Sequence, residues 1–266
     1  MKLMIHLTTE KTEDYTELIR DYQIRCLRFL CVILCVFGGF SQFACTSSEA
    51  RLAEARSLMR QGKFREALTP LNQAVEADNQ NAQAFVARGV AYFELKEYAN
   101  ALLDYEQAQK LQPDFYQPYY NRALLKTAQG DTDGAIKDYS EAIRFAPDTS
   151  RSVAADIYLN RGQLFAGTGN LTSALTDFQK AIELNPQNAL AYFNRGSIHF
   201  QQDEYPVALT DFAKAVQLDP KFGKAFHALG VTQVMTGQRE AACLSLKQSQ
   251  KLGYADAAAS LQQYCE

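Results

Sequence analysis

The chain repeats a pattern of residues every 34 positions, and this period constrains its fold more than any other feature. Aligned on residues 189–222, with one insertion at residues 150–154, the chain divides into six units: 48–81, 82–115, 116–149, 155–188, 189–222 and 223–254. Each unit of such a chain contacts only its neighbours, so the units are expected to stack in one dimension. This expectation replaces the one or two globular domains that 266 residues would otherwise suggest.

Small and large apolar residues alternate within each unit. The eighth and twenty-seventh positions hold small residues, and the twentieth is alanine in all six units: Ala67, Ala101, Ala135, Ala174, Ala208 and Ala242. The fourth and twenty-fourth positions hold mostly Phe, Tyr or Leu. This spacing is typical of two amphipathic helices, and a larger side chain at the small positions would push them apart at a cost of about 1 to 3 kcal/mol. Each unit is therefore predicted to be a packed pair of helices, A and B.

Glycine and proline mark the turns between these helices. Glycine lies between helices A and B in four units, where a helix end often needs a left-handed residue: Gly62, Gly130, Gly169 and Gly237. Proline closes helix B in four units: Pro113, Pro147, Pro186 and Pro220.

Together these positions resemble the tetratricopeptide repeat (TPR), a helix-turn-helix unit of 34 residues. The resemblance covers residues 48 to about 254 and implies an all-α fold, a right-handed α-solenoid of six units. Residues 255–266 are predicted to form a helix that caps the stack, with Ala258, Leu261 and Tyr264 on its apolar face.

Four central units share an Arg at position 7 and an Asp at position 23: Arg88 with Asp104, Arg122 with Asp138, Arg161 with Asp177, and Arg195 with Asp211. We predict that these pairs form a ladder of contacts between helices A and B. The alternative is that each group is simply solvated, in which case a pair is worth about 0 to 1 kcal/mol.

The inward-facing positions of helix A are the candidate peptide groove. Their apolar, aromatic and polar residues suit an extended or helical peptide: Phe93, Tyr120, Asn121, Leu124, Leu159, Asn160, Phe193, Asn194, Ser197, Phe200 and His227. The TPR resemblance implies that the Asn residues hydrogen-bond the backbone of a ligand, and a local hydrogen bond within the repeat is the alternative. The apolar members are either contact residues or ordinary packing. The Lys and Arg that flank the Asn in clamps for acidic C-termini are missing here.

Charge and motifs argue against nucleic acid and catalysis. The formal net charge is -3, and Lys and Arg are interleaved with Asp and Glu, so no basic stripe for nucleic acid exists. The three histidines lack the partners of a nucleophilic triad, and no HExxH, phosphate loop or CxxC pair occurs. We expect no enzyme activity and no cofactor or metal.

The N-terminal segment has the layout of an export signal. Arg25 and Arg28 precede an apolar run, residues 29–40, which is too short for a comfortable membrane span. Ala44 and Cys45 resemble the end of a bacterial lipobox, although Gln42 and Phe43 depart from its usual residues. Residues 1–44 are therefore interpreted as a leader and residues 45–47 as a tether. The interpretation favours a lipid on Cys45, with ordinary secretion and an uncleaved signal anchor as alternatives.

Two cysteines, Cys243 and Cys265, lie in the mature domain, about equally far on either side of the bend predicted at Gly253. In an oxidising compartment they are candidates for a disulfide, and two free thiols in the cap are the alternative.

The sequence thus predicts an exported, membrane-anchored scaffold or adaptor of a bacterial cell envelope, located in the outer membrane or periplasm. Its partner is expected to be a protein or peptide that binds in the concave groove. The alternative is a structural assembly factor for outer-membrane or pilus machinery that uses the convex face or the ends of the stack.

Overall fold

The computed structural model describes residues 47–146 and 151–265, and its regular structure in those ranges is entirely α-helical. The A helices are α2 (Ser48–Arg60), α4 (Ala82–Glu94), α6 (Tyr116–Gln129), α8 (Arg151–Gly167), α10 (Ala189–Gln201) and α12 (Gly223–Met235). The B helices are α3 (Phe64–Ala77), α5 (Tyr98–Leu111), α7 (Thr132–Phe145), α9 (Leu171–Leu184), α11 (Tyr205–Leu218) and α13 (Arg239–Lys251). A last helix, α14 (Ala257–Cys265), follows them. The leader and Cys45 lie outside the described residues.

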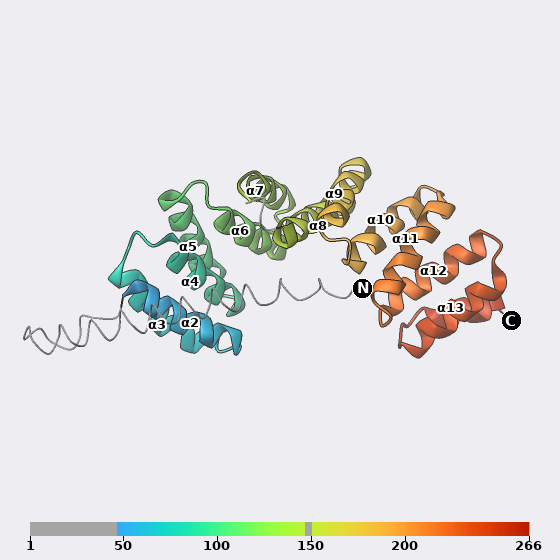
Figure 1. Cartoon of the computed structure of the whole chain (residues 1–266), viewed down its shortest axis with the longest axis horizontal. Coiled ribbons are helices and arrows are strands. Elements are labelled where there is room, and N and C mark those ends of the chain that lie inside the picture. Colours follow the sequence, from blue (N-terminus) through green and yellow to red (C-terminus); the bar gives the residue numbers. More distant parts are fainter. Residues whose placement is uncertain (1–46, 147–150, 266) are drawn as a thin grey trace, which may run out of the picture.

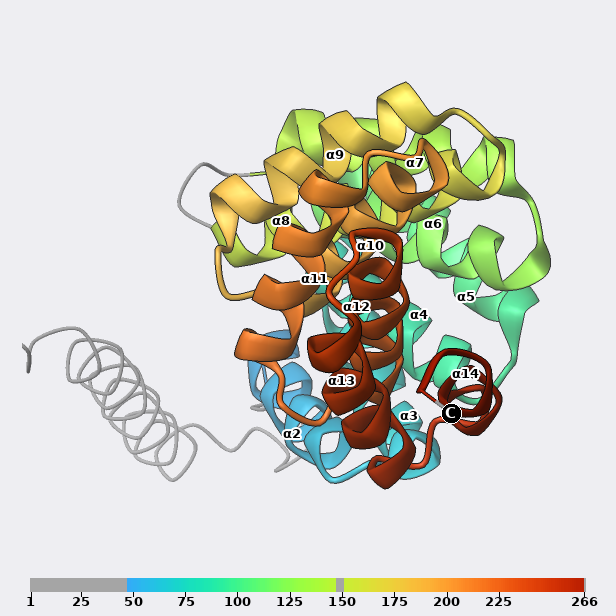
Figure 2. The ribbon, with the colours of Figure 1, turned by 90° about the vertical axis from the view of Figure 1, so that its right-hand side faces the viewer.

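The helix pairs follow one another along an arc (Figure 1), and the view along the stack shows α14 at its C-terminal end (Figure 2). Each helix packs against the next one in the chain, and A helices of neighbouring units also contact each other. Because the A helices approach each other more closely than the B helices do, they line the inner, concave side of the arc. The predicted α-solenoid of helix pairs is confirmed.

The interior of each pair is built as the repeat predicts. The alanines at position 20 have no exposed surface, and the large residues at position 24 are at most 2% exposed: Leu71, Tyr105, Tyr139, Phe178, Phe212 and Leu246. Glycine at position 8 lets the helices approach each other closely. A Cβ added at Gly89 would lie 2.5 Å from Cε1 of Tyr105. The small residues are therefore required by the packing.

One residue in each A–B turn adopts a left-handed conformation. The four predicted glycines do so, with φ between +74° and +80°. The same position in the second and fifth units is occupied by Lys96 (φ 62°) and Asp203 (φ 61°), which the glycine pattern did not predict. The turn geometry thus repeats in all six units even where its preferred residue does not.

Polar side chains begin several helices. A side-chain oxygen accepts a bond from the backbone N–H three residues later at Ser47, Asn81, Asp131, Asn170 and Asn188. Such caps satisfy donors that have no partner within the helix. Within residues 47–146 and 151–265, no helix combines the length and apolar character needed to cross a bilayer.

Two details differ from the prediction. The inserted residues 151–154 form the first turn of α8, which therefore starts before the expected unit boundary. In α14 the buried residues are Ala257 and Leu261, whereas Ala258 is exposed and Tyr264 is only half-buried. The expected apolar face was therefore wrong at Ala258, because the side of α14 that packs on the stack carries residues 257 and 261, which are four positions apart.

Candidate functional site

The Arg–Asp ladder forms, and it lies within the units. In each of the four pairs the Arg Nε and Nη2 donate to the two carboxylate oxygens of the Asp, for example at 2.8 and 2.7 Å from Arg122 to Asp138. The four Asp residues are at most 5% exposed. The bond to the carboxylate raises the pKa of Arg88, Arg122 and Arg195, so these guanidinium groups stay charged. The prediction of a ladder is confirmed, and these charges are structural.

The remaining nitrogen of each Arg connects its unit to the one before. Arg Nη1 donates to a polar side chain on the preceding B helix: Asn72, Gln109, Ser140 and Gln179. Each guanidinium also lies over the aromatic ring at position 4 of its own helix, at 5.5 to 5.9 Å. These contacts between units were not predicted, because the acceptor varies in residue type and once in position.

Two of the predicted groove residues belong to the core. Leu159 and Phe193 are only 6% and 7% exposed. Phe193 packs against Phe212 and Phe222, with ring centroids 5.7 and 4.9 Å apart, and Lys224 lies over its ring. Of the two alternatives for the apolar residues of this face, partner contact or ordinary packing, the burial of these two favours packing.

Two aromatic residues of the face are held by a tyrosine from helix B. Phe93 packs against Tyr98, and Phe200 packs against Tyr205, with ring centroids 5.7 and 5.3 Å apart. Both Phe residues are half-buried, so each presents part of its ring. Leu124 and Asn121 are half-buried as well. The hydroxyl of Ser197, another residue of this face, donates to the Phe193 carbonyl oxygen at 2.8 Å.

Tyr120, Asp156 and Asn160 form a polar cluster between α6 and α8. Burial raises the pKa of Tyr120, the Asp156 charge adds to the rise, and a hydrogen bond with Asn160 opposes it. Asp156 was not among the predicted residues, although it lies one helical turn before Asn160 on the same helix and shares its face.

Asn194 occupies the same repeat position as Asn160, one unit later. The repeat places Leu159 opposite Asn194, where Tyr120 lies opposite Asn160. Leucine cannot accept a hydrogen bond, and Asn194 Nδ2 is buried without a partner among the described residues. The local hydrogen bond that was the alternative for these Asn residues therefore exists at Asn160 and is missing at this nitrogen of Asn194.

His227 faces the capping helix and not an open groove. Its Nε2 lies 2.8 Å from Ser260 Oγ of α14, and its ring lies 5.1 Å from that of Tyr254. Burial lowers the pKa of His227, and the nearby Asp256 partly offsets this effect. His227 thus contacts α14, which occupies the place where the next A helix would be.

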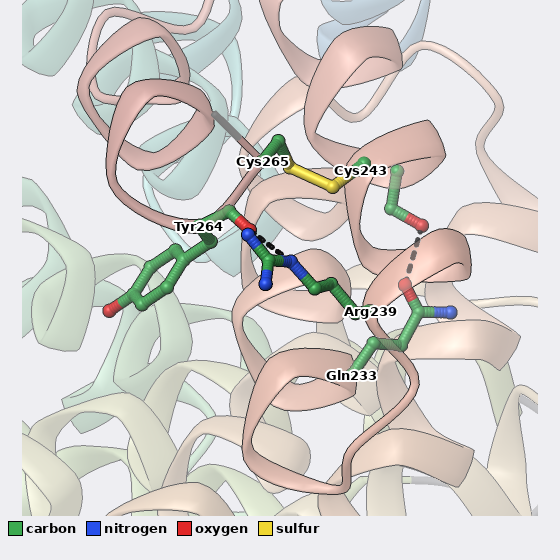
Figure 3. Close-up of a disulfide and its surroundings, with 6 residues drawn as sticks. Gln233, Arg239, Cys243, Tyr264 and Cys265 are labelled. Carbon is green, nitrogen blue, oxygen red and sulfur yellow. Dashed lines mark hydrogen bonds between the residues drawn. A yellow bond between two sulfur atoms is a disulfide. The ribbon is translucent and has the colours of Figure 1, made fainter.

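A disulfide joins Cys243 of α13 to Cys265 of α14, with the Cα atoms 5.8 Å apart (Figure 3). Arg239 Nε donates to the Tyr264 carbonyl oxygen beside it, at 2.9 Å. Gln233 accepts a hydrogen bond from Ser245 Oγ at 2.8 Å, which joins α12 to α13. The sequence had left this pair open between a disulfide and free thiols.

The described residues contain no group of three or more His, Cys, Asp or Glu arranged to hold a metal. A shallow hollow on α10 and α11 is lined by Arg195 and Asp211, but these two are bonded to each other and offer no free charge.

The fold and this face define a helical-repeat scaffold. Family models of the tetratricopeptide repeat match residues 52–114, 116–149 and 189–222, and a model described as TPR repeat matches residues 162–203. Together these matches cover more than half of the chain, which belongs to the tetratricopeptide repeat family.

Similar proteins support the same family. Tetratricopeptide repeat protein 6 of Homo sapiens is 27% identical over 140 residues, 53% of this chain and 26% of that protein. The chain thus spans about a quarter of the length of that relative. The structure of YrrB, described as a TPR protein with an unusual peptide-binding site, covers 73% of this chain and 97% of its own at 22% identity, with a TM-score of 0.61. The structure of PilW, a type IV pilus biogenesis factor, covers 81% and 98% at 19% identity, with a TM-score of 0.67.

Proposed function

We propose that the chain is a scaffold that binds a segment of another protein along its concave face. The observation that carries this proposal is the buried, unpartnered amide nitrogen of Asn194. An unpaired buried donor costs about 1 to 3 kcal/mol. The fold does not require an amide at this position, because alanine occupies it in three other units: Ala53, Ala87 and Ala228.

In this proposal a main-chain carbonyl oxygen of a partner segment is the acceptor for Asn194 Nδ2. Phe93, Leu124 and Phe200 offer partly exposed apolar surface on the same side of the stack. Main-chain hydrogen bonds combined with apolar contacts are a common basis of peptide recognition.

The face favours a partner segment without acidic side chains. Positions 2, 5, 9, 12 and 13 of the second to fifth units carry no Lys or Arg, and Asp156 and Glu94 are acidic. Little Coulomb attraction is available, so binding should depend only weakly on salt.

A photocrosslinking series on the full chain tests the groove. The crosslinker is placed at Thr127, which is exposed on α6 near Leu124, and the partner is identified by mass spectrometry. We expect the crosslinked partner to be lost in Asn194→Ala and retained in Ala128→Ser, a control on the exposed surface of the same helix as the crosslinker. Retention of the partner in Asn194→Ala, with the protein still folded, would reject the groove proposal.

The proposal includes the bacterial cell envelope as the location, with the chain exported and anchored to the membrane by a lipid on Cys45. One acyl chain binds membranes only weakly, so stable anchoring requires the several chains of a bacterial lipoprotein. Mass spectrometry of the mature N-terminus tests this: an acylated Cys45 is expected, and Cys45→Ser should release the protein from membranes. A mature N-terminus that still contains the apolar run would instead support a signal anchor.

A second candidate is an assembly factor that uses the outer layer of B helices. The observation that favours it is a large exposed leucine at the same repeat position in two units, Leu103 (65% exposed) and Leu244 (70% exposed). PilW, a type IV pilus biogenesis factor, shares the fold. Replacement of both leucines by Glu distinguishes the candidates: loss of the crosslinked partner supports the outer layer, and retention supports the groove.

A further inference from the structure

The C-terminal end of the stack is a helix-binding surface that α14 occupies. This helix packs mainly on α13 and also contacts α12, as an A helix of a seventh unit would. It buries Ala257 and Leu261, four residues apart, and Ser260 lies against His227. The surface is thus shaped for a helix with a small residue and a leucine one turn apart.

The helix α14 is short and is exposed on the side that faces away from the stack. It has nine residues, and a helix of this length is marginal on its own in water. Besides the two buried side chains, its bonds to the stack are the Ser260–His227 contact, the Arg239–Tyr264 bond and the disulfide. The disulfide is the only covalent tie apart from the chain itself, which passes through the left-handed Gly253.

Both cysteines of this disulfide are only half-buried, so a thiolate can reach them. A reduced dithiol, either a small molecule or a dithiol protein, attacks one sulfur and displaces the other as a thiolate. Its second thiol then resolves the mixed disulfide. Two electrons and two protons pass to Cys243 and Cys265, and the reductant leaves as a disulfide.

We propose that the disulfide controls access to this surface. While it is closed, α14 covers the end of the stack. After reduction, α14 detaches and the end accepts an amphipathic helix of a partner protein. The chemistry of that helix is given by α14 itself: a small residue and a leucine at i and i+4, a hydroxyl residue just before the leucine, and a C-terminal carbonyl facing Arg239. This site is separate from the concave groove and does not depend on the proposed function.

The first test compares amide hydrogen exchange of the oxidised and reduced full chain. We expect exchange of the α14 amides to increase at least about tenfold on reduction, while α4 to α9 keep their protection. Unchanged protection of α14 after reduction would overturn the proposal.

The second test measures acceptance of a helix. The probe is a fluorescent peptide of residues 255–266 with Cys265→Ser, and the open protein is the full chain with Leu261→Asp and Cys265→Ser, which disfavours docking of its own helix. We expect the peptide to bind the open protein at least about tenfold more tightly than the oxidised wild type, because the tethered α14 no longer competes. A peptide with Leu261→Asp should not bind.

Equal binding to the open and oxidised proteins, or binding to neither, would overturn the proposal. A far-UV spectrum and thermal transition like those of the wild type establish that the open protein is folded. If its spectrum or thermal transition differs from that of the wild type, the binding measurement is repeated with a milder variant, Leu261→Ala with Cys265→Ser. Dimerisation of the reduced wild type in sedimentation would assign the vacated surface to a second copy, and would also overturn its assignment to a partner's helix.

Discussion

Residues at the same repeat position have different surroundings in different units of this protein. Position 6 is alanine in three units and asparagine in the three others. Asn160 shares a hydrogen bond with Tyr120, whereas Asn194 keeps a buried donor without an acceptor. Two identical residues in the same repeat position therefore differ in what they contribute to stability.

Alanine substitutions at these two positions should change stability in opposite directions. Asn194→Ala removes the unpaired donor and improves helix propensity, so we expect the free energy of unfolding to rise by about 1 kcal/mol. Asn160→Ala removes the hydrogen bond with Tyr120, and we expect a fall of about 0.5 kcal/mol after the gain in propensity. Urea unfolding measures both. A change of the same sign in the two variants would contradict this account of Asn194.

The contact of His227 with α14 should make stability depend on pH. Burial holds the pKa of His227 in the folded protein below its ordinary value of about 6.5. The folded state therefore binds fewer protons than the unfolded state in this range. The contribution of neutral His227 is fully present above about pH 6.5 and is lost as the pH falls through the folded pKa.

His227→Gln keeps a partner for Ser260 and cannot titrate in this range. We expect the stability advantage of the wild type over this variant to shrink as the pH falls below about 6.5. Thermal unfolding of both proteins between about pH 5 and 8 measures it. The same comparison in proteins that also carry Leu261→Asp is the control, and the pH dependence should disappear there. A difference between wild type and variant that is independent of pH would refute the assignment.

The repeat position predicts the direction of a side chain, but not whether the residues around it cover that side chain. Phe193 is covered by Phe212 and Phe222 of its own unit and by Lys224 of the next, and His227 contacts α14. Lys224 belongs to the following unit and α14 lies outside the six repeats, so the pattern of one unit does not contain them.

At the scale of elements, the period predicted the helix pairs and their turns well, because each depends on residues close together in the sequence. Two elements depart from the pattern of the repeat. Inserted residues 151–154 form the first turn of α8, and α14 uses a different face from the one that apolar spacing indicated. The insertion and α14 both lie outside the repeating positions, so the period does not describe them.

The second unit carries an avoidable strain in its turn. Lys96 adopts φ 62°, where the first, third, fourth and sixth units have glycine. A lysine in the left-handed region costs roughly 1 kcal/mol, so Lys96→Gly should raise the free energy of unfolding by up to about 1 kcal/mol. Lys96→Ala keeps the strain and serves as the control in the same urea titration. Destabilisation by Lys96→Gly would show that the side chain contributes more than its backbone costs.

Two glycines in α8 should respond oppositely to the same substitution. A Cβ at Gly162 would lie 2.8 Å from Cε1 of Phe178, whereas a Cβ at Gly167 would meet nothing within 4 Å. We expect Gly162→Ala to lower the free energy of unfolding by about 1 to 3 kcal/mol through overpacking. Gly167→Ala should raise it by about 0.5 to 1 kcal/mol through backbone entropy. Thermal or urea unfolding distinguishes them, and similar effects would place the constraint elsewhere in the helix.

At the scale of the whole molecule, the Arg–Asp pairs do more than close each unit. Arg122 bonds Asp138 within its unit and Gln109 on the preceding B helix, so one side chain ties three helices together. A solenoid is stabilised by its units and by the interfaces between neighbours, and a weak interface lets the two sides unfold separately. The central ladder therefore contributes to cooperativity as well as to stability.

Loss of the Asp138 carboxylate is the single substitution that we expect to reduce this cooperativity most. Its carboxylate accepts two bonds from Arg122 and lies 2.9 Å from Lys126 Nζ, and the residue is 2% exposed. Asp138→Ala leaves two neighbouring cations without their anion, and we expect a loss of about 3 to 5 kcal/mol. Because the loss falls in the third of six units, urea unfolding followed by circular dichroism should change from one transition to two.

Glu54→Ala, which breaks an exposed pair with Arg51 in the first unit, should cost less than about 1 kcal/mol and keep one transition. A single transition in Asp138→Ala, shifted no more than in Glu54→Ala, would mean that packing of the small residues couples the units without the ladder.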